Sequence, residues 1–226
     1  MLGLLAGALI NVLADYLPRR KWSGWHISAR HLLAELFTAL LFAFLWQRYG
    51  PSPRLFFETL YTAIFILLFI IDLEHRLILH VTTLPAIVLA IAGSFFLGRE
   101  RYSWRLALLG GGTGFFLVWS MYIFGRFFVR FMEWLRGKKI KEVAFGFGDV
   151  TLMTFIGTVL GFPNVVFALL LGVLLGGLGG AVYWLIKALV RRDYSLFTAI
   201  PYGPFLITGG WTLMIWGQEF LEWYLA

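Results

Sequence analysis

Long apolar stretches follow one another along almost the whole chain, separated by short polar breaks, and this succession constrains the fold more than any other feature. A stretch of about 20 apolar residues can cross the hydrocarbon layer of a membrane as one α-helix. Hydrophobic residues make up 60% of the 226 residues and charged residues only 14%, a balance outside the range of soluble domains. We therefore predict an all-α, polytopic integral membrane protein with about eight transmembrane helices, at residues 2–17, 32–48, 55–71, 78–97, 106–124, 150–162, 164–187 and 204–221.

The basic residues predict the orientation of these helices. With the N terminus outside, 14 of the 19 Lys and Arg residues fall on the inner side, as the positive-inside rule favours. Only the loop at 98–105, with three arginines and one glutamate, argues the other way. Basic loops also account for the net charge of +7, and no nucleic-acid-binding module accompanies it, so we expect no nucleic-acid partner. The absence of cysteine excludes disulfides, thiolate metal sites and cysteine nucleophiles.

Two aspartates stand at the ends of expected spans. Asp72 ends the third span and Asp149 begins the sixth, so the predicted orientation places both carboxyl groups at the cytoplasmic face. An acid next to hydrocarbon costs several kcal/mol unless it is paired, solvated or protonated, which makes both residues functional candidates. Each has a simpler interpretation as well. Asp149 suits a helix N-cap, and Asp72 could pair with Arg76 one turn later.

The remaining acids have ordinary explanations. Asp15 and Glu35 lie near inner helix ends, where pairing with Arg19 or Arg30 is expected. Four glutamates lie near the outer ends, where contact with water would explain them: Glu58, Glu100, Glu219 and Glu222.

Two carboxyl groups brought together at one face would share a proton, because repulsion prevents both from being ionised. The ionised group can then withdraw a proton from water while the neutral group polarises an amide carbonyl, as in aspartic proteolysis. Gly146 and Gly148 precede Asp149 and would leave room for a substrate strand.

Three motifs in this chain resemble those of the type IV prepilin peptidases, which are aspartic membrane proteases of the Gly-x-Gly-Asp type. They are "IIDLEHRLILHVTTLP" at 70–85, "FGFGDVTLMTFIGTVLGF" at 145–162 and "IPYGPFLITGG" at 200–210. The stretches at 6–20 and 27–45 are similar to the first helix of the bacterial members and to the segment after their cytoplasmic loop.

The resemblance implies that Asp72 and Asp149 are the catalytic pair and that Gly146 and Gly148 form the loop that admits substrate. It implies removal of the basic leader peptide from type IV prepilins or type II secretion pseudopilins, at the cytoplasmic side of a bacterial inner membrane. The expected partners are those substrates and membrane lipids, and no oligomeric state is inferred. We expect a two-helix region at 1–52 and a six-helix peptidase core at 53–226.

The chain departs from the family pattern at three places. Leu79-His80 replaces the usual Pro-Asp, and Thr151 replaces a lysine that commonly follows the Gly-x-Gly-Asp motif. The cytoplasmic loop with two Cys-x-x-Cys pairs has shrunk to "RRKWSGWHISAR". Proteolysis needs no cofactor, zinc is not expected, and S-adenosylmethionine would be required only if the family's N-methylation of the new terminus is retained. The i, i+5 spacing of His75 and His80 also argues against a metal site.

Other interpretations stay open at this level. An intramembrane acid could relay protons or ions in a transporter, and an inactive relative could serve as a scaffold for a pilus or secretion machine. Glycines at 172, 176 and 180 indicate either close helix packing or flexibility of the seventh span. The basic and aromatic segment 126–141 is typical of a helix lying in the inner interface against anionic lipid.

Overall fold

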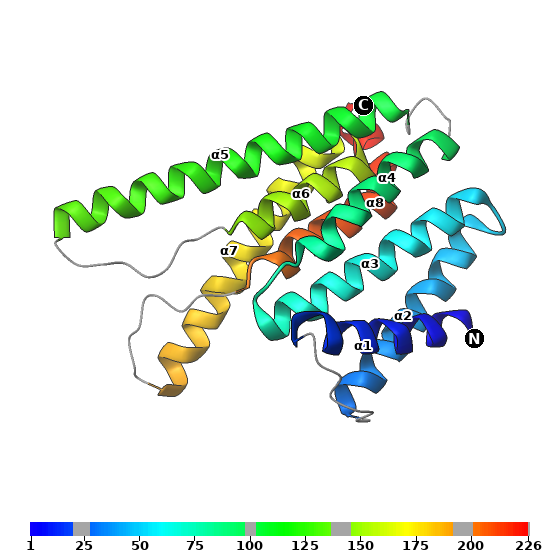
Figure 1. Cartoon of the computed structure of the whole chain (residues 1–226), viewed down its shortest axis with the longest axis horizontal. Helices are drawn as coiled ribbons and strands as arrows, with labels where there is room; N and C mark the ends of the chain where they lie inside the picture. The colour runs from blue at the N-terminus through cyan, green and yellow to red at the C-terminus, as the bar shows by residue number, and fades with distance from the viewer. Residues whose placement is uncertain (20–27, 98–102, 137–145, 192–200, 226) are drawn as a thin grey trace.

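The computed structural model describes residues 1–19, 28–97, 103–136, 146–191 and 201–225, and within these ranges every regular element is an α-helix (Figure 1). The helices are α1 (Leu2–Arg19), α2 (Ala29–Tyr49), α3 (Pro53–His75), α4 (His80–Leu97), α5 (Trp104–Arg136), α6 (Phe147–Leu160), α7 (Asn164–Arg191) and α8 (Gly203–Leu225). Six of them, α1 to α5 and α7, contain segments long and apolar enough to cross a membrane. The prediction of an all-α, multi-pass membrane protein is confirmed.

Local sequence signals explain where α3 begins and ends. Ser52 is the N-cap, its hydroxyl oxygen accepts a hydrogen bond from the Leu55 amide at 3.2 Å, and Pro53 occupies the first helical turn, where a missing N–H costs nothing. At the other end Arg76 adopts a left-handed conformation with φ of 53°, and its amide donates to the carbonyl oxygen of Asp72 at 2.8 Å. The α3 helix therefore stops one turn after Asp72.

The α6 helix lies at the centre of the bundle, in contact with α4, α5, α7 and α8. It is apolar on all sides, and 11 of its 14 residues are buried. At 1.5 Å per residue it is about 21 Å long, which is shorter than the roughly 30 Å hydrocarbon layer. Because its neighbours replace lipid around it, α6 does not need to span the full layer by itself.

Glycines allow α5 and α6 to approach closely. A Cβ atom at Gly110 would collide with the carbonyl oxygen of Gly157, and one at Gly157 would collide with the carbonyl oxygen of Gly110. In contrast, a Cβ atom at Gly112, two residues further along the same helix, would meet nothing within 4 Å. The small residues thus form a seam along which the two backbones pack, as transmembrane helices commonly do.

The α5 helix is longer than predicted. The fifth span was expected to end at 124, followed by a separate interfacial segment at 126–141, but α5 continues without a break to Arg136. Its 33 residues correspond to about 50 Å, so one helix both crosses the bundle and carries the basic and aromatic residues beyond it. Residues 137–141 of the expected segment lie outside the described residues.

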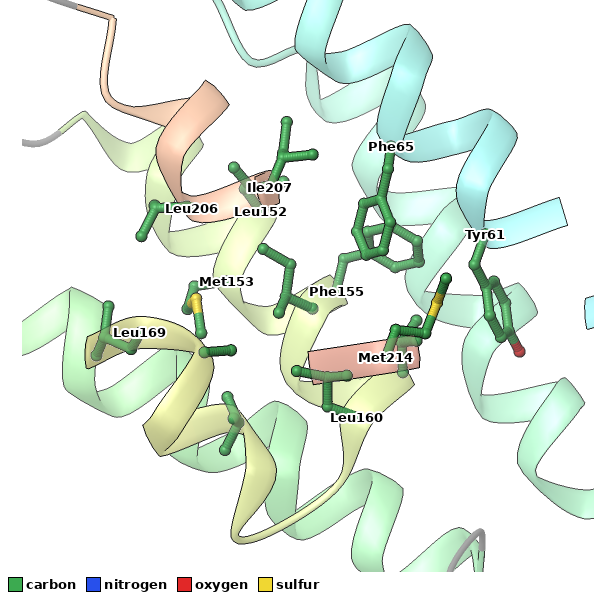
Figure 2. Packing of buried hydrophobic residues seen from close by; sticks show 14 of the residues in the cluster. Tyr61, Phe65, Leu152, Met153, Phe155, Leu160, Leu169, Leu206, Ile207 and Met214 are labelled. Atoms are coloured by element: carbon green, nitrogen blue, oxygen red, sulfur yellow. The ribbon is translucent and has the colours of Figure 1, made fainter. Parts of the chain in front are cut away.

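The core of the bundle joins α3, α6 and α8. Phe65 of α3 and Phe155 of α6 contact ring to ring, with 5.1 Å between centroids, and Leu206 and Met214 of α8 belong to the same cluster (Figure 2). The indole N–H of Trp211 in α8 also donates to the hydroxyl of Thr62 in α3 at 3.2 Å. These contacts fix α3 and α8 against each other and against the central helix, and so fix the relative positions of their ends.

Figure 1 shows α3 finishing and α4, α6 and α8 beginning at one end of the bundle, with α5 and α7 extending past it. We call this the aspartate end, because Asp72 closes α3 and Asp149 opens α6 there. The glycines of α7 pack against the start of α8 at this end. A Cβ atom at Gly176 would lie 2.5 Å from the Tyr202 ring, and one at Gly172 would lie 3.0 Å from the Leu206 side chain, which supports the packing interpretation of these glycines.

Candidate active site

Asp72 is held in a buried position by the last turn of α3. Its relative exposure is 5%, and its Oδ2 atom has no hydrogen-bond partner among the described residues. The backbone of Gly203, at the start of α8, lies against this carboxyl group, since a Cβ atom there would be 2.5 Å from Oδ2 and 3.0 Å from Cγ. A buried carboxyl oxygen without a partner is costly, and such groups concentrate at functional sites. The pairing of Asp72 with Arg76 is long-range only, because the Arg76 charge acts on Asp72 but no ion pair of 4.0 Å or less joins them.

Asp149 is held at the start of α6 by the turn that precedes it. The N-cap is Gly146, not Asp149 as the simple interpretation expected, and Asp149 occupies the third helical position. From there its Oδ2 atom accepts a hydrogen bond from the Gly146 amide at 2.8 Å. Only 9% of Asp149 is exposed. The carboxylate therefore does cap the helix, but by reaching back, and this bond orients it toward the aspartate end.

The two aspartates come from helices far apart in sequence and lie close enough for the charge of Asp72 to act on Asp149. Both are buried, so neither charge is well screened by water. Two carboxyl groups that interact strongly can titrate as a coupled pair that shares one proton. Such a pair can supply one general base and one general acid from chemically identical side chains.

Ile78, in the turn between α3 and α4, lies between the elements that carry the two aspartates. A Cβ atom at Gly148 would lie 2.8 Å from the Cβ of Ile78, and one at Gly203 would lie 3.2 Å from its Cδ1. Gly148 is thus required by close packing, whereas a Cβ atom at Gly146 would come no nearer than 3.8 Å to any atom. The two glycines of the motif have different roles in the structure: Gly146 caps α6, and Gly148 admits Ile78.

Tyr202 and Gly203 complete the site, although sequence reasoning did not assign them to it. Burial raises the pKa of Tyr202, and the charge of Asp149 raises it further, which places the phenol near Asp149 while Gly203 contacts Asp72. Both belong to the "PYGPF" stretch, the third of the motifs described above. The signal that could have identified them is the glycine followed by proline at the start of an apolar helix, since proline is common in a first helical turn and glycine leaves room for a neighbouring group.

Two of the three departures from the family pattern, His80 and Thr151, contact each other. Nδ1 of His80 lies 3.4 Å from Oγ1 of Thr151, and the Thr151 hydroxyl also lies 3.2 Å from that of Thr83. The His80 ring meets the edge of Phe147, with 5.6 Å between centroids. Where the family pattern has an acid and a lysine, this chain has a histidine and a threonine that link the start of α4 to the start of α6.

A network of charged residues ties the N-terminal helices to the end of α3. Arg30 donates to both carboxylate oxygens of Glu74 at 2.7 and 2.6 Å and to Asp15 at 2.8 Å, and His31 lies 3.0 Å from Asp15. The expected pairing of Asp15 with Arg30 is confirmed. Glu74 follows Asp72 by two residues, so α2 is anchored directly beside the candidate site, a connection that the sequence did not reveal.

The expected positions of other residues can be compared with the structure. Among the described residues, no group of three or more His, Asp and Glu side chains could hold a metal ion. Glu35 accepts a hydrogen bond from Asn11 at 3.3 Å. The expectation that water surrounds Glu58 was wrong, because this residue is only 3% exposed. Glu219 pairs with Arg48 and is exposed, while residue 100 lies outside the described residues.

The family model and the curated relatives that match this chain indicate the same family. The model of the type IV leader peptidase family matches residues 59–181, a range that contains both Asp72 and Asp149. Curated relatives named "Prepilin leader peptidase/N-methyltransferase" include one from Xanthomonas campestris, 28% identical over 92% of this chain, and one from Aeromonas hydrophila, 30% identical over 88% of it. One from Pseudomonas aeruginosa is 29% identical over 88% of the chain.

The matched part covers 66% of the length of the Xanthomonas relative and 63% of the Aeromonas relative, so the chain spans less than two thirds of these proteins. No solved structure matches the chain.

Proposed function

Because the chain belongs to the type IV leader peptidase family, we propose that it is a membrane-embedded aspartic endopeptidase that removes the basic leader peptide of type IV prepilins or pseudopilins. The observation that carries this proposal is the burial of Asp72 and Asp149 at one end of the bundle, close enough for their charges to interact. The names of the relatives give the substrate class, and their sequence similarity extends over most of the chain.

In the proposed reaction the two carboxyl groups share one proton. The ionised group takes a proton from a water molecule, which attacks the carbonyl carbon of the scissile amide, while the neutral group donates its proton to the carbonyl oxygen. The resulting tetrahedral intermediate breaks its C–N bond as a carboxyl group protonates the leaving amine. The Gly146 amide fixes the Asp149 carboxylate for this step, and Gly203 leaves the space that the Asp72 carboxyl group occupies.

We place the reaction at the cytoplasmic face of a bacterial inner membrane. The described basic residues support this orientation, because the helix segments at the aspartate end carry Arg19, Arg30, Arg76, Arg126, Arg130 and Arg136, against Arg48, Arg54 and Arg105 at the opposite end. Loops and helix ends rich in Lys and Arg are retained on the cytoplasmic side. The substrate's leader would then be cut before its apolar segment leaves the membrane.

The peptidase core is proposed to comprise residues 53–226, with residues 1–52 as an additional helical pair. Support comes from the family match at 59–181 and from Gly203 in α8, which contributes to the site from beyond that range. The methyl transfer named in the relatives would need S-adenosylmethionine. The proposed reaction concerns proteolysis alone.

The test is cleavage of a prepilin-derived peptide with an intact leader and apolar segment, by purified protein in detergent, with products identified by mass spectrometry. Asp72→Asn and Asp149→Asn are each expected to abolish cleavage, because either change removes the shared proton. Glu219→Gln, at the opposite end of the bundle, is the matched control and should cleave normally.

Cleavage by either aspartate variant would refute the dyad. Intact peptide with the unchanged protein, together with ion flux in proteoliposomes that requires Asp149, would instead support a transporter. The same mass spectra report an added methyl group on the new N terminus if methylation is retained.

A further inference from the structure

A cavity of about 530 Å³ lies at the end of the bundle opposite the aspartates. Side chains of α3, α4, α5, α6 and α8, and of the turn that leads into the first residue of α7, line it, and most of them are apolar, including Leu97, Leu106 and Phe162. The polar lining is concentrated in a few residues, among them Glu58, Asn164, Gln218 and Glu222. This cavity takes no part in the proposed proteolysis, since about 14 residues of α3, or roughly 21 Å, separate Glu58 from Asp72.

Glu58 brings an unsatisfied acceptor into the cavity. The residue is only 3% exposed, and its Oε1 atom pairs with Nε of Arg54 at 3.3 Å. Its Oε2 atom has no hydrogen-bond partner in the described structure, and neither has Oδ1 of Asn164 at the start of α7. Burying a carboxylate oxygen without a donor is strongly unfavourable, so a ligand that supplies N–H or O–H donors to these acceptors is expected in the cavity.

The charges around Glu58 define the ligand more closely. Arg54 pairs with Oε1 of Glu58 and Arg48 pairs with Glu219, and neither arginine lines the cavity. The acceptors that line the cavity therefore suit a ligand with a positively charged group that carries N–H donors. The apolar walls favour hydrocarbon attached to that head.

The depth of the cavity in the membrane agrees with a lipid head group. The α3 helix begins at Pro53, and Glu58 lies five residues later, which is about 8 Å along the helix axis. Because α3 is about 34 Å long and the hydrocarbon layer about 30 Å thick, Glu58 lies a few ångströms inside the hydrocarbon, within reach of a head group at its boundary. An ethanolamine phospholipid fits these features, with its ammonium toward Glu58 and its acyl chains along the apolar walls.

We propose that this cavity is a binding site for ethanolamine phospholipid, recognised through donation from its primary ammonium group to Glu58 and Asn164. A choline head group has the same charge but no N–H donor, so it cannot satisfy the two acceptors. The site should therefore discriminate between two lipids that differ only in methylation of the head-group nitrogen.

The experiment is native mass spectrometry of the whole purified chain, titrated with phosphatidylethanolamine or phosphatidylcholine of identical acyl chains. The ethanolamine lipid is expected to bind at least tenfold more tightly, equivalent to about 1.4 kcal/mol. Glu58→Gln should remove this preference, whereas Glu219→Gln, an exposed acid on neighbouring α8, should keep it. Leu97→Trp, which fills the cavity without changing the carboxyl group, should weaken binding of both lipids and serves if Glu58→Gln does not fold.

Equal affinity of the unchanged protein for the two lipids would overturn the proposal. So would a preference for the ethanolamine lipid that survives both Glu58→Gln and Leu97→Trp. Competition with glycerophosphoethanolamine, which has the head group but no acyl chains, distinguishes a lipid ligand from a water-soluble one. Equal displacement by this soluble compound would show that the site takes a water-soluble amine and would refute the lipid assignment.

Discussion

Gly203→Ala adds a single methyl group beside one catalytic candidate. The new Cβ atom would lie 2.5 Å from Oδ2 of Asp72, 3.0 Å from its Cγ and 3.2 Å from Cδ1 of Ile78. Contacts between such atoms are ordinarily about 3.5 Å or more, so the carboxyl group must move by up to about 1 Å. A displacement of this size in a reacting group costs roughly 10²-fold in rate, or about 2.7 kcal/mol.

The cost to folding should be smaller than the cost to activity. Overpacking of a buried site destabilises by about 1–3 kcal/mol, and here one clashing partner is the end of a side chain, which can rotate at the lower end of that cost. We therefore expect Gly203→Ala to lose about 100-fold in kcat for cleavage of the prepilin-derived peptide, with a small decrease in Tm. Rates would be measured by mass spectrometry under single-turnover conditions, and Tm by tryptophan fluorescence in the same detergent.

Gly177→Ala is the matched control. Gly177 lies in α7, which packs against α8, but a Cβ atom there would meet nothing within 4 Å. Activity should be unchanged, and Tm should stay constant or rise slightly because alanine favours the helix. If Gly203→Ala cleaves within threefold of the unchanged protein, Asp72 either does not occupy the described position or does not act in the reaction.

Three further sets of substitutions test other contacts. Gly157→Ala should destabilise the bundle by about 1–3 kcal/mol, because its methyl group meets the backbone of α5, whereas Gly112→Ala should be neutral or stabilising in the same thermal unfolding assay; equal effects would contradict the α5–α6 seam. His80→Ala and Thr151→Ala should couple by about 0.5–1 kcal/mol in a double-mutant cycle of unfolding, and strict additivity would show that their contact contributes nothing. Arg30→Ala should lower kcat several-fold while Arg30→Lys restores part of it, because the arginine anchors α2 next to the end of α3; a change in Tm with unaltered kcat would limit the network to a structural role.

Much of the fold could be predicted because a membrane protein must satisfy its backbone polar groups within each segment. A long apolar stretch therefore predicts a helix. Successive helices cross the membrane in opposite directions, so their ends lie alternately on its two sides. Asp72 and Asp149 were expected at a common face for this reason alone, and the structure brings both to the aspartate end. Local capping chemistry was predicted less well, since Gly146 and not Asp149 is the N-cap.

Contacts between distant segments could not be predicted in the same way. Ile78 carries no signal in a chain with 60% hydrophobic residues, yet it packs against both Gly148 and Gly203. Glu58 was expected in water because of its place near a helix end, and its burial depends on side chains from five other parts of the chain. The length of a helix by itself also gave no reason to expect that α6 would be enclosed by four neighbours.

The sequence alone therefore determined that this chain is a helical membrane protein and that its two candidate catalytic acids stand at helix ends on one side, because hydropathy and helix alternation act along the chain. The tertiary structure decided which groups surround those acids: Gly203 against Asp72, Tyr202 near Asp149 and Ile78 between their helices. These contacts join segments far apart in sequence. They depend on how closely particular side chains and glycines let the helices pack, which no local pattern specifies.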